Sequence, residues 1–157
     1  MARQGKADEA ERIFTLLKVI SASREETIAI GEGLAKKLKS GDVVALIGDL
    51  GSGKTVFTKG IAKGLGVKAA HSRVNSPSFV IIKEHKARIP LYHFDLYRLD
   101  RTSSLDQMNY EEYFYRGGVT VIEWADKILP LLPSRYIEVK LSVIGENKRK
   151  IGIRKVR

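Results

Sequence analysis

The segment between residues 48 and 55 constrains this chain more than any other, because it fits the pattern G-x-x-x-x-G-K-[ST] at every fixed position. Its residues are Gly48-Asp49-Leu50-Gly51-Ser52-Gly53-Lys54-Thr55. In this pattern the glycines let main-chain N–H groups close around phosphate oxygens. The lysine supplies a positive charge to the terminal phosphates, and the threonine hydroxyl faces Mg²⁺. The sequence therefore predicts a nucleoside triphosphate site.

The flanks of this motif predict the strand and the helix that it requires. Residues 42–47 form a nearly continuous apolar run, which is typical of a strand buried on both faces of a parallel sheet. After the motif, apolar residues recur at fourfold spacing, at Phe57, Ile61 and Leu65. This stripe predicts a helix that ends near Gly64 and Gly66. A glycine-rich turn that matched by chance would lack this context, so we expect a functional phosphate loop.

Length and composition limit the class of protein. The chain has 157 residues, of which 43% are hydrophobic, so we expect one domain over residues 1–157. No apolar stretch approaches the ~20 residues that cross a bilayer, and Lys18 divides the apolar run near the amino terminus. A cytoplasmic protein without membrane contact is therefore expected. The absence of cysteine excludes disulfides, and the three histidines have no ligand spacing, so zinc is not expected.

The charge of the chain leaves two explanations open. A formal net charge of +10 favours a polyanionic partner such as a nucleic acid, but it is also compatible with an ordinary solvated surface. The basic residues are spread out, with one denser group at Lys148, Arg149, Lys150, Arg154, Lys155 and Arg157.

The amino-terminal and central parts of the chain predict helices packed on strands. Within residues 1–20, a partly frayed start precedes an edge strand over residues 13–20. The capping box at residues 23–26 begins a helix that ends before Gly41. Residues 71–78 show no clear periodicity. Strands at 79–83 and 91–95 are expected to form an antiparallel hairpin.

The carboxyl-terminal half completes a mixed sheet. We predict a helix over residues 103–115 and an apolar strand over 119–124, while Pro130 and Pro133 interrupt any helix that follows. Alternating apolar residues predict a final β-hairpin within residues 136–157. The sum is a sheet that is parallel around the phosphate loop and antiparallel elsewhere, with helices packed on it.

Two acidic residues end apolar strands, where ligands of such sheets gather. Asp95 ends the strand 91–95, and Glu123 lies near the end of the strand 119–124. Either carboxylate could simply cap a helix or meet a surface cation. Downstream of a phosphate loop, however, the pair suits a site in which Mg²⁺ takes oxygen ligands and one carboxylate positions or deprotonates water. Trp124, which follows Glu123, is either a core side chain or an interaction residue.

Four segments occur in an order that matches one known family. They are residues 48–55, Asn-Ser-Pro-Ser-Phe at 75–79, Tyr-His-Phe-Asp-Leu-Tyr-Arg-Leu at 92–99 and Ile-Glu-Trp at 122–124. Together they resemble the TsaE (YjeE) family of bacterial P-loop ATPases, which are required for threonylcarbamoyladenosine modification of tRNA. The resemblance runs from about Thr27 to Glu123. It implies a three-layer, P-loop NTPase-like α/β fold, with a mixed parallel and antiparallel sheet flanked by helices.

The resemblance also implies roles for individual residues. Lys54 and the amides of the loop would hold ATP phosphates, and Thr55 with Glu123 would hold Mg²⁺. Asp95 would be the carboxylate needed for hydrolysis, so the implied catalytic set is Asp95, Glu123 and Lys54. Thr27 and Arg149 would be neighbours of the nucleotide.

A further implied element is a switch-like loop formed by Ser76, Pro77, Ser78 and Phe79, which would respond to the γ-phosphate. The family usually has threonine where this chain has Ser78, although a hydroxyl is kept. The family glycine before the Glu-Glu-Tyr segment is Asn109 here, a residue that also tolerates left-handed backbone angles.

The function implied by the resemblance is that of an accessory ATPase, weak by itself and dependent on partner proteins. It would bind a heterodimer of TsaB and TsaD, in which TsaD transfers the threonylcarbamoyl group to the adenosine beside the anticodon. ATP binding and hydrolysis would drive assembly or resetting of that complex. Contact with tRNA would be indirect or through the basic surface.

Two other classes of function stay open. A small-molecule kinase would share the phosphate loop and could use Arg98 or Arg101 as a lid clamp, but the sequence shows no evident acceptor pocket or lid insertion. A nucleotide-dependent binding switch with negligible turnover would differ only in whether Asp95 and Glu123 are placed for chemistry. A GTPase is not indicated, because no Asn-Lys-x-Asp segment occurs.

Overall fold

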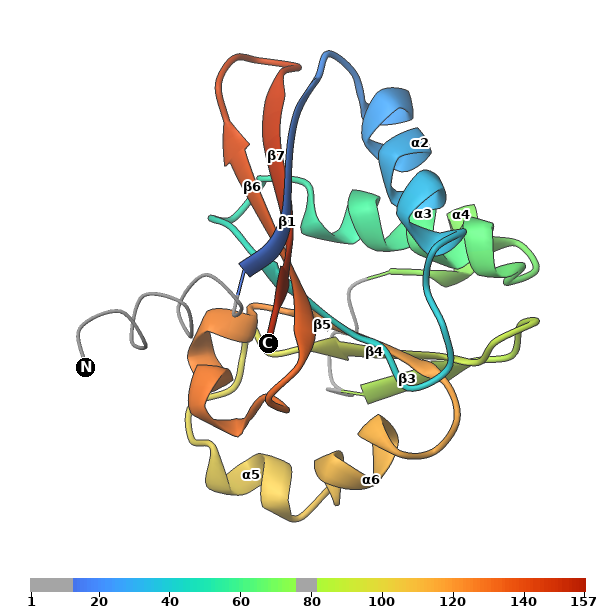
Figure 1. Cartoon of the computed structure of the whole chain (residues 1–157), viewed down its shortest axis with the longest axis vertical. Helices are drawn as coiled ribbons and strands as arrows, with labels where there is room; N and C mark the ends of the chain where they lie inside the picture. Colours follow the sequence, from blue (N-terminus) through green and yellow to red (C-terminus); the bar gives the residue numbers. More distant parts are fainter. Residues whose placement is uncertain (1–12, 76–81) are drawn as a thin grey trace.

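A seven-stranded sheet forms the centre of the protein in the computed structural model, which describes residues 13–75 and 82–157. Its order is β1-β7-β6-β2-β5-β4-β3 (Figure 1). The strands are β1 Ile13–Ser21, β2 Val43–Ile47, β3 Ile82–His85, β4 Leu91–Asp95, β5 Val119–Glu123, β6 Tyr136–Val143 and β7 Arg149–Val156. β2 pairs in parallel with β5 and β6, and β4 pairs in parallel with β5. The outer pairs are antiparallel, so the predicted mixed sheet is confirmed.

Helices cover both faces of this sheet. On one side lie α2 Arg24–Ala35, α3 Lys54–Leu65 and the short α4 Ala70–Arg73, and on the other lie α5 Ser103–Asp106, α6 Tyr110–Phe114 and the 3₁₀ segment η1 Ala125–Leu131 (Figure 1). None of the helices in the described part of the chain combines the length and the apolar character that a bilayer crossing needs.

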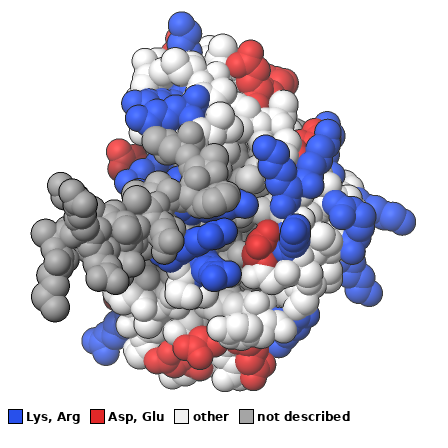
Figure 2. Space-filling model, in the orientation of Figure 1, with Lys and Arg blue, Asp and Glu red and all other residues white. Residues whose placement is uncertain are grey.

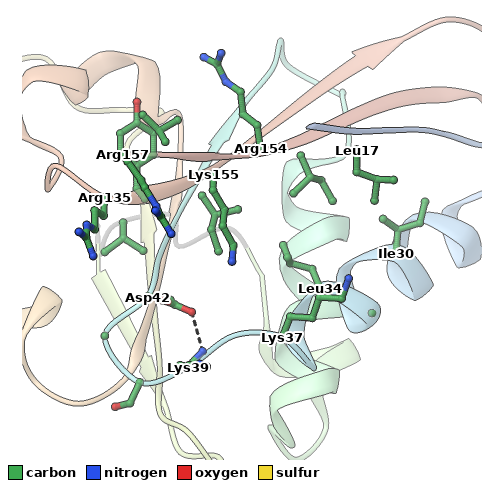
Figure 3. A pocket seen from close by; sticks show the side chains of 18 residues that line it. Leu17, Ile30, Leu34, Lys37, Lys39, Asp42, Arg135, Arg154, Lys155 and Arg157 are labelled. Atoms are coloured by element: carbon green, nitrogen blue, oxygen red, sulfur yellow. Dashed lines mark hydrogen bonds between the residues drawn. The ribbon is translucent and has the colours of Figure 1, made fainter. Parts of the chain in front are cut away.

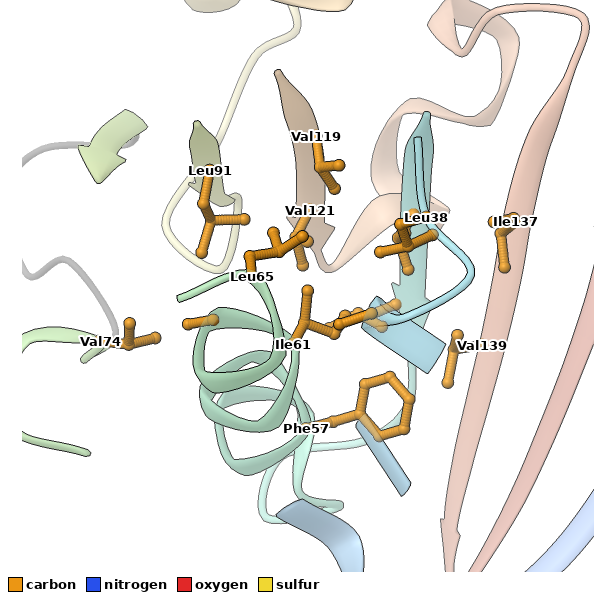
Figure 4. Packing of buried hydrophobic residues seen from close by; sticks show 14 of the residues in the cluster. Leu38, Phe57, Ile61, Leu65, Val74, Leu91, Val119, Val121, Ile137 and Val139 are labelled. Atoms are coloured by element: carbon orange, nitrogen blue, oxygen red, sulfur yellow. The ribbon is translucent and has the colours of Figure 1, made fainter. Parts of the chain in front are cut away.

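Alternation along the strands builds the two cores. In β2, Val44 and Leu46 belong to the cluster packed against α2 and α3, whereas Val43 and Ala45 belong to the cluster under α5, α6 and η1. Successive side chains of a strand point to opposite faces, which is why a continuous apolar run forms a central strand. Figure 4 shows the predicted stripe of α3, Phe57, Ile61 and Leu65, directed at the strands. The sheet is therefore a rigid support for the loop between β2 and α3.

Several local predictions are confirmed. The Ser23 hydroxyl accepts the Glu26 N–H at 3.1 Å, which is the first half of the predicted capping box. The return bond from Glu26 goes to the residue before the N-cap, since Oε2 accepts the Ala22 N–H at 2.6 Å. β1 is an edge strand, as expected. The end of α3 is set by Gly66, whose left-handed φ of 88° is the conformation of a glycine C-cap. β6 and β7 form the predicted terminal hairpin.

The sequence patterns were wrong or silent in three places. The predicted single helix over 103–115 is two short helices, because Asn109 adopts a left-handed φ of 51° between α5 and α6. Residues 71–73 lie in α4, a turn of helix too short to show periodicity. The prediction that Pro130 and Pro133 interrupt any helix is confirmed only in part. Pro130 lies inside η1, but η1 is kinked at Ile128, with φ −132°, and it ends at Leu131, before Pro133. Of the predicted strand 79–83, residues 79–81 lie outside the described residues.

Candidate functional site

The loop between β2 and α3 has the geometry of an anion cradle. Gly53, the residue before the helix, has a left-handed φ of 101°, and no side chain in the described part of the chain caps the helix start. The first helical hydrogen bond is donated by Phe57 N–H to Gly53 O at 2.8 Å, so the preceding N–H groups of the helix have no acceptor within it. A Cβ on Gly48 would overlap Ser52 Oγ and lie 2.6 Å from Leu141 O. The loop is thus closely packed at Gly48, while the N–H groups at the start of α3 are available to an anion.

Lys54 places its ammonium group inside this loop. Its Nζ donates to Gly48 O at 2.6 Å and to Asp49 O at 2.8 Å, and lies 3.9 Å from the centroid of the Trp124 ring. The residue is only 5% exposed. Burial lowers the pKa of Lys54, and the nearby carboxylates, led by Glu123 and then Asp95, act in the opposite direction. A desolvated cation in this position attracts an anion more strongly than one in water.

Glu123 is held by three side chains at the end of β5. Thr55 Oγ1 donates to its Oε2 at 2.9 Å, and His93 Nε2 lies 2.8 Å from its Oε1. Thr58 Oγ1 lies 3.3 Å from the same Oε1, while it donates to Lys54 O at 2.9 Å. Glu123 is 2% exposed and His93 is fully buried. The carboxylate is therefore fixed, with Oε2 turned toward Thr55.

Asp95 lies beside Glu123, because β4 and β5 are parallel and the two residues are paired in register. Asp95 Oδ1 accepts the Tyr97 N–H at 3.0 Å. Burial raises the pKa of Asp95, the Tyr97 N–H lowers it, and the neighbouring Glu123 charge raises it further. The two strand-end carboxylates and the phosphate-loop threonine are thus brought together, as the sequence predicted.

Trp124 turns the chain away from the sheet, with a left-handed φ of 61°. Its ring lies 5.1 Å from that of Tyr97 between centroids and covers the Lys54 ammonium. Lys127 Nζ donates to Tyr97 O at 2.6 Å and lies 5.9 Å from both rings. Trp124 is therefore more than core filling, although its role in an interaction stays a prediction.

Two residues from outside the central motif also border the loop. Arg149, at the start of β7, donates from Nη2 to Gly51 O at 3.2 Å and from Nη1 to three carbonyls of its own hairpin turn. Thr27 is buried at the start of α2, and its Cγ2 would lie 4.0 Å from a Cβ placed on Gly53. Both residues therefore border the loop, and their contact with a nucleotide stays a prediction.

The switch residues Ser76, Pro77, Ser78 and Phe79 lie outside the described residues.

Two residues of the site were missed by the sequence analysis, namely His93 and Thr58. His93 precedes Asp95 by two residues, so both side chains share one face of β4. Thr58 follows Lys54 by four residues, which is one helical turn. Both spacings are visible in the sequence, but neither shows that these side chains contact Glu123. That contact depends on the strand order, which places β5 between β4 and β2.

The donors present suit a hard cation that arrives with a ligand. Thr55 and Glu123 offer a hydroxyl and a carboxylate oxygen, which are the ligand types that Mg²⁺ prefers. Within residues 13–75 and 82–157, no group of three or more His, Cys, Asp or Glu could hold a metal ion. Mg²⁺ commonly takes one or two protein ligands and completes its shell with phosphate oxygens and water, so the two donors fit it.

The comparisons with known proteins agree on one family. Residues 21–151 match the family model described as threonylcarbamoyl adenosine biosynthesis protein TsaE. The tRNA threonylcarbamoyladenosine biosynthesis protein TsaE of Bacillus subtilis is 43% identical over 136 residues, which are 86% of this chain and 83% of that protein. The protein of the same name from Treponema pallidum is 34% identical over 87% of this chain and 99% of that protein. The crystal structure of Bacillus subtilis YdiB is similar, with a TM-score of 0.73 and 38% identity over 92% of this chain and 88% of that one.

Proposed function

The chain belongs to the TsaE family of threonylcarbamoyl adenosine biosynthesis proteins, and from that premise we propose that it is an Mg²⁺-dependent ATPase supporting the formation of N6-threonylcarbamoyladenosine in tRNA. The observation that carries the proposal is the convergence of Lys54, Thr55, Glu123 and Asp95 at one end of the parallel strands. This is where ligands of open α/β sheets bind.

Each residue then has a distinct task in the proposed site. The N–H groups at the start of α3 and the Lys54 ammonium bind the phosphate chain and stabilise its charge. Thr55 and Glu123 would hold Mg²⁺, which when bound supplies Lewis-acid stabilisation of the phosphate charge. Lys54 is buried beneath Trp124, so its attraction for phosphate is little screened by water.

Asp95 is the group that would orient and deprotonate water. Burial and the adjacent Glu123 raise its pKa, and a carboxylate with a raised pKa is a stronger base. The hydrogen bond that Oδ1 of Asp95 accepts from the Tyr97 N–H fixes the direction of the carboxylate. Neither Thr55 nor Lys54 is a base in this arrangement, since each donates its protons to neighbouring acceptors.

The proposal extends to partners. We expect the protein to bind the TsaB–TsaD heterodimer and to use ATP for assembling or resetting that complex, with slow hydrolysis in its absence. Binding energy from the partner would then drive the conformational change that orders the site for chemistry, as in induced fit.

The test is phosphate release by the purified protein, measured alone and with TsaB, TsaD and tRNA. We expect strong stimulation for the natural chain, none for Asp95→Asn, and full stimulation for Asp100→Asn, an exposed carboxylate outside the site. Equal stimulation of Asp95→Asn would remove Asp95 from the mechanism. ATP binding without release would identify a binding switch, and phosphate transfer to a metabolite would identify a kinase; either result refutes the proposed function.

A further inference from the structure

A second hollow lies at the opposite end of the sheet from the phosphate loop. It is a groove of about 930 Å³ between α2, the loop at residues 39–42 and the strands β1, β6 and β7 (Figure 3). It includes the beginnings of β2 and β6 and the last residues of β7, and none of residues 48–55 lines it. A ligand here and a nucleotide at the loop would therefore occupy different ends of the same strands.

The groove is strongly cationic. Six of its lining residues are basic, namely Lys37, Lys39, Arg135, Arg154, Lys155 and Arg157. Among the described residues that line it, only Asp42 is acidic, and its Oδ2 accepts the Lys39 main-chain N–H at 2.7 Å. Figure 2 shows Lys and Arg side chains gathered over the middle of this face around an acidic patch, with further acidic side chains nearer its edges. The dense basic group of the sequence is thus divided, since Arg149 borders the phosphate loop and the last residues of β7 line the groove.

These cations differ in how they are neutralised. Arg154 makes a two-pronged pair with Glu138, with both nitrogen–oxygen distances at 2.9 Å, so its charge is already balanced. Lys37, Lys39 and Arg135 are exposed and make no side-chain hydrogen bond or ion pair with any other described residue. Cations grouped around one groove repel each other, and a polyanion relieves that repulsion while releasing its own counterions.

The floor of the groove argues for a polyanion over an amphipathic peptide. Ile30, Leu34 and Ile153 line it, but all three are packed against the core and only partly exposed. Leu17, which is 51% exposed, is more accessible to a ligand than any of these three. An amphipathic segment needs a row of open apolar pockets for its anchors, whereas a phosphate backbone needs cations at the rim.

We propose that this groove binds the phosphate backbone of an RNA, with Lys37, Lys39 and Arg135 as its contacts. The choice of RNA over DNA rests on the proposed function in tRNA modification. Such contacts position a nucleic acid without reading its sequence. The separation from the phosphate loop lets the chain hold RNA and ATP together.

The test uses fluorescence anisotropy with an unmodified tRNA transcript. In the double variant Lys37→Gln/Lys39→Gln, we expect binding about tenfold weaker, and a slope of log K against log[salt] smaller by about one per lysine. The matched control is Lys68→Gln/Lys86→Gln, which removes the same charge from exposed lysines outside the groove and should stay within about twofold of the natural chain.

Three outcomes would overturn the proposal. The first is that the natural chain does not bind the transcript, and the second is that both double variants weaken its binding equally. The third is that poly-glutamate displaces the labelled transcript as effectively as unlabelled RNA does, which would identify an acidic protein partner. ATP affinity is measured on the same samples and should be unchanged in both variants. Loss of RNA binding with ATP binding intact separates this groove from the ATPase site, and absence of RNA binding leaves the ATPase proposal standing.

Discussion

The buried contact between His93 and Glu123 yields a prediction whose size follows from the structure. His93 Nε2 lies 2.8 Å from Glu123 Oε1, and Nδ1 has no hydrogen-bond partner among the described residues. A carboxylate only accepts, so Nε2 carries the proton and donates. His93→Leu keeps the side-chain volume roughly but removes this donor, leaving a 2% exposed carboxylate short of a hydrogen bond. Because a hydrogen bond to a charged group contributes about 1.5–3 kcal/mol, we expect a loss of about 2 kcal/mol in the free energy of unfolding.

In a chain of this size that loss lowers the melting temperature by about 4–8 °C. Glu123 is also expected to hold Mg²⁺, and loss of a residue that orients a metal ligand typically weakens binding by about 10–100-fold. The gain in ATP affinity on adding Mg²⁺ should therefore fall by at least about tenfold in His93→Leu. His93→Gln, whose amide nitrogen reaches the same position, should recover most of both effects. Circular dichroism and nucleotide titration check them. This account of His93 would be refuted if His93→Leu kept the melting temperature and the Mg²⁺-dependent ATP affinity of the natural chain. It would also be refuted if His93→Gln lost as much of both as His93→Leu does.

The remaining predictions concern stability. Burial, with smaller contributions from His93, Lys83 and Arg73, lowers the pKa of His85 from 6.5 to about 4. Between these two pH values the unfolded chain binds more protons than the folded chain. The contribution of His85 to the free energy of unfolding is therefore present above pH 6.5 and is lost as the pH falls toward 4, by up to about 3 kcal/mol. Urea unfolding at several pH values should show this loss, and it should be smaller in His85→Gln. Arg154→Ala leaves Glu138, which is 5% exposed, without its two-pronged partner, and should cost about 3 kcal/mol in the free energy of unfolding. Lys150→Ala, at an exposed lysine of the same strand, should cost less than about 0.5 kcal/mol by the same measurement. Equal effects of these two substitutions would show that the buried pair contributes nothing specific.

Much of the site could be predicted because its parts are local in the sequence. The phosphate loop is eight consecutive residues between an apolar run and a helical stripe, and each of these patterns is set by the periodicity of its own element. The two strand-end carboxylates could also be identified, since the ends of parallel strands meet at one edge of a sheet. Their pairing in register as Asp95 with Glu123 confirms that inference.

What could not be predicted depends on contacts between distant segments. The contact between Thr55 and Glu123 joins residues 68 positions apart, and that between His93 and Glu123 joins residues 30 apart. Both require the order β2-β5-β4, which periodicity does not specify. The groove is likewise formed by α2 and by strands from both ends of the chain. The division of residues 103–115 into two helices depended on one left-handed residue, Asn109, which a helical stripe does not reveal.

The central claim, that the loop and Lys54 bind the phosphates of ATP, is tested most directly by titrating ATP with and without Mg²⁺ and following the fluorescence of Trp124. This residue is the only tryptophan of the chain, and its ring lies 3.9 Å from Lys54 Nζ, so a phosphate drawn to Lys54 should change its emission. We expect saturable binding that tightens with Mg²⁺ in the natural chain, and binding at least about 100-fold weaker in Lys54→Ala, because the terminal phosphates lose their buried cation. Lys63→Ala, an exposed lysine of the same helix, should bind as the natural chain does. Equal ATP affinity in Lys54→Ala and the natural chain, measured by isothermal calorimetry to exclude a change in the optical signal alone, would contradict the account.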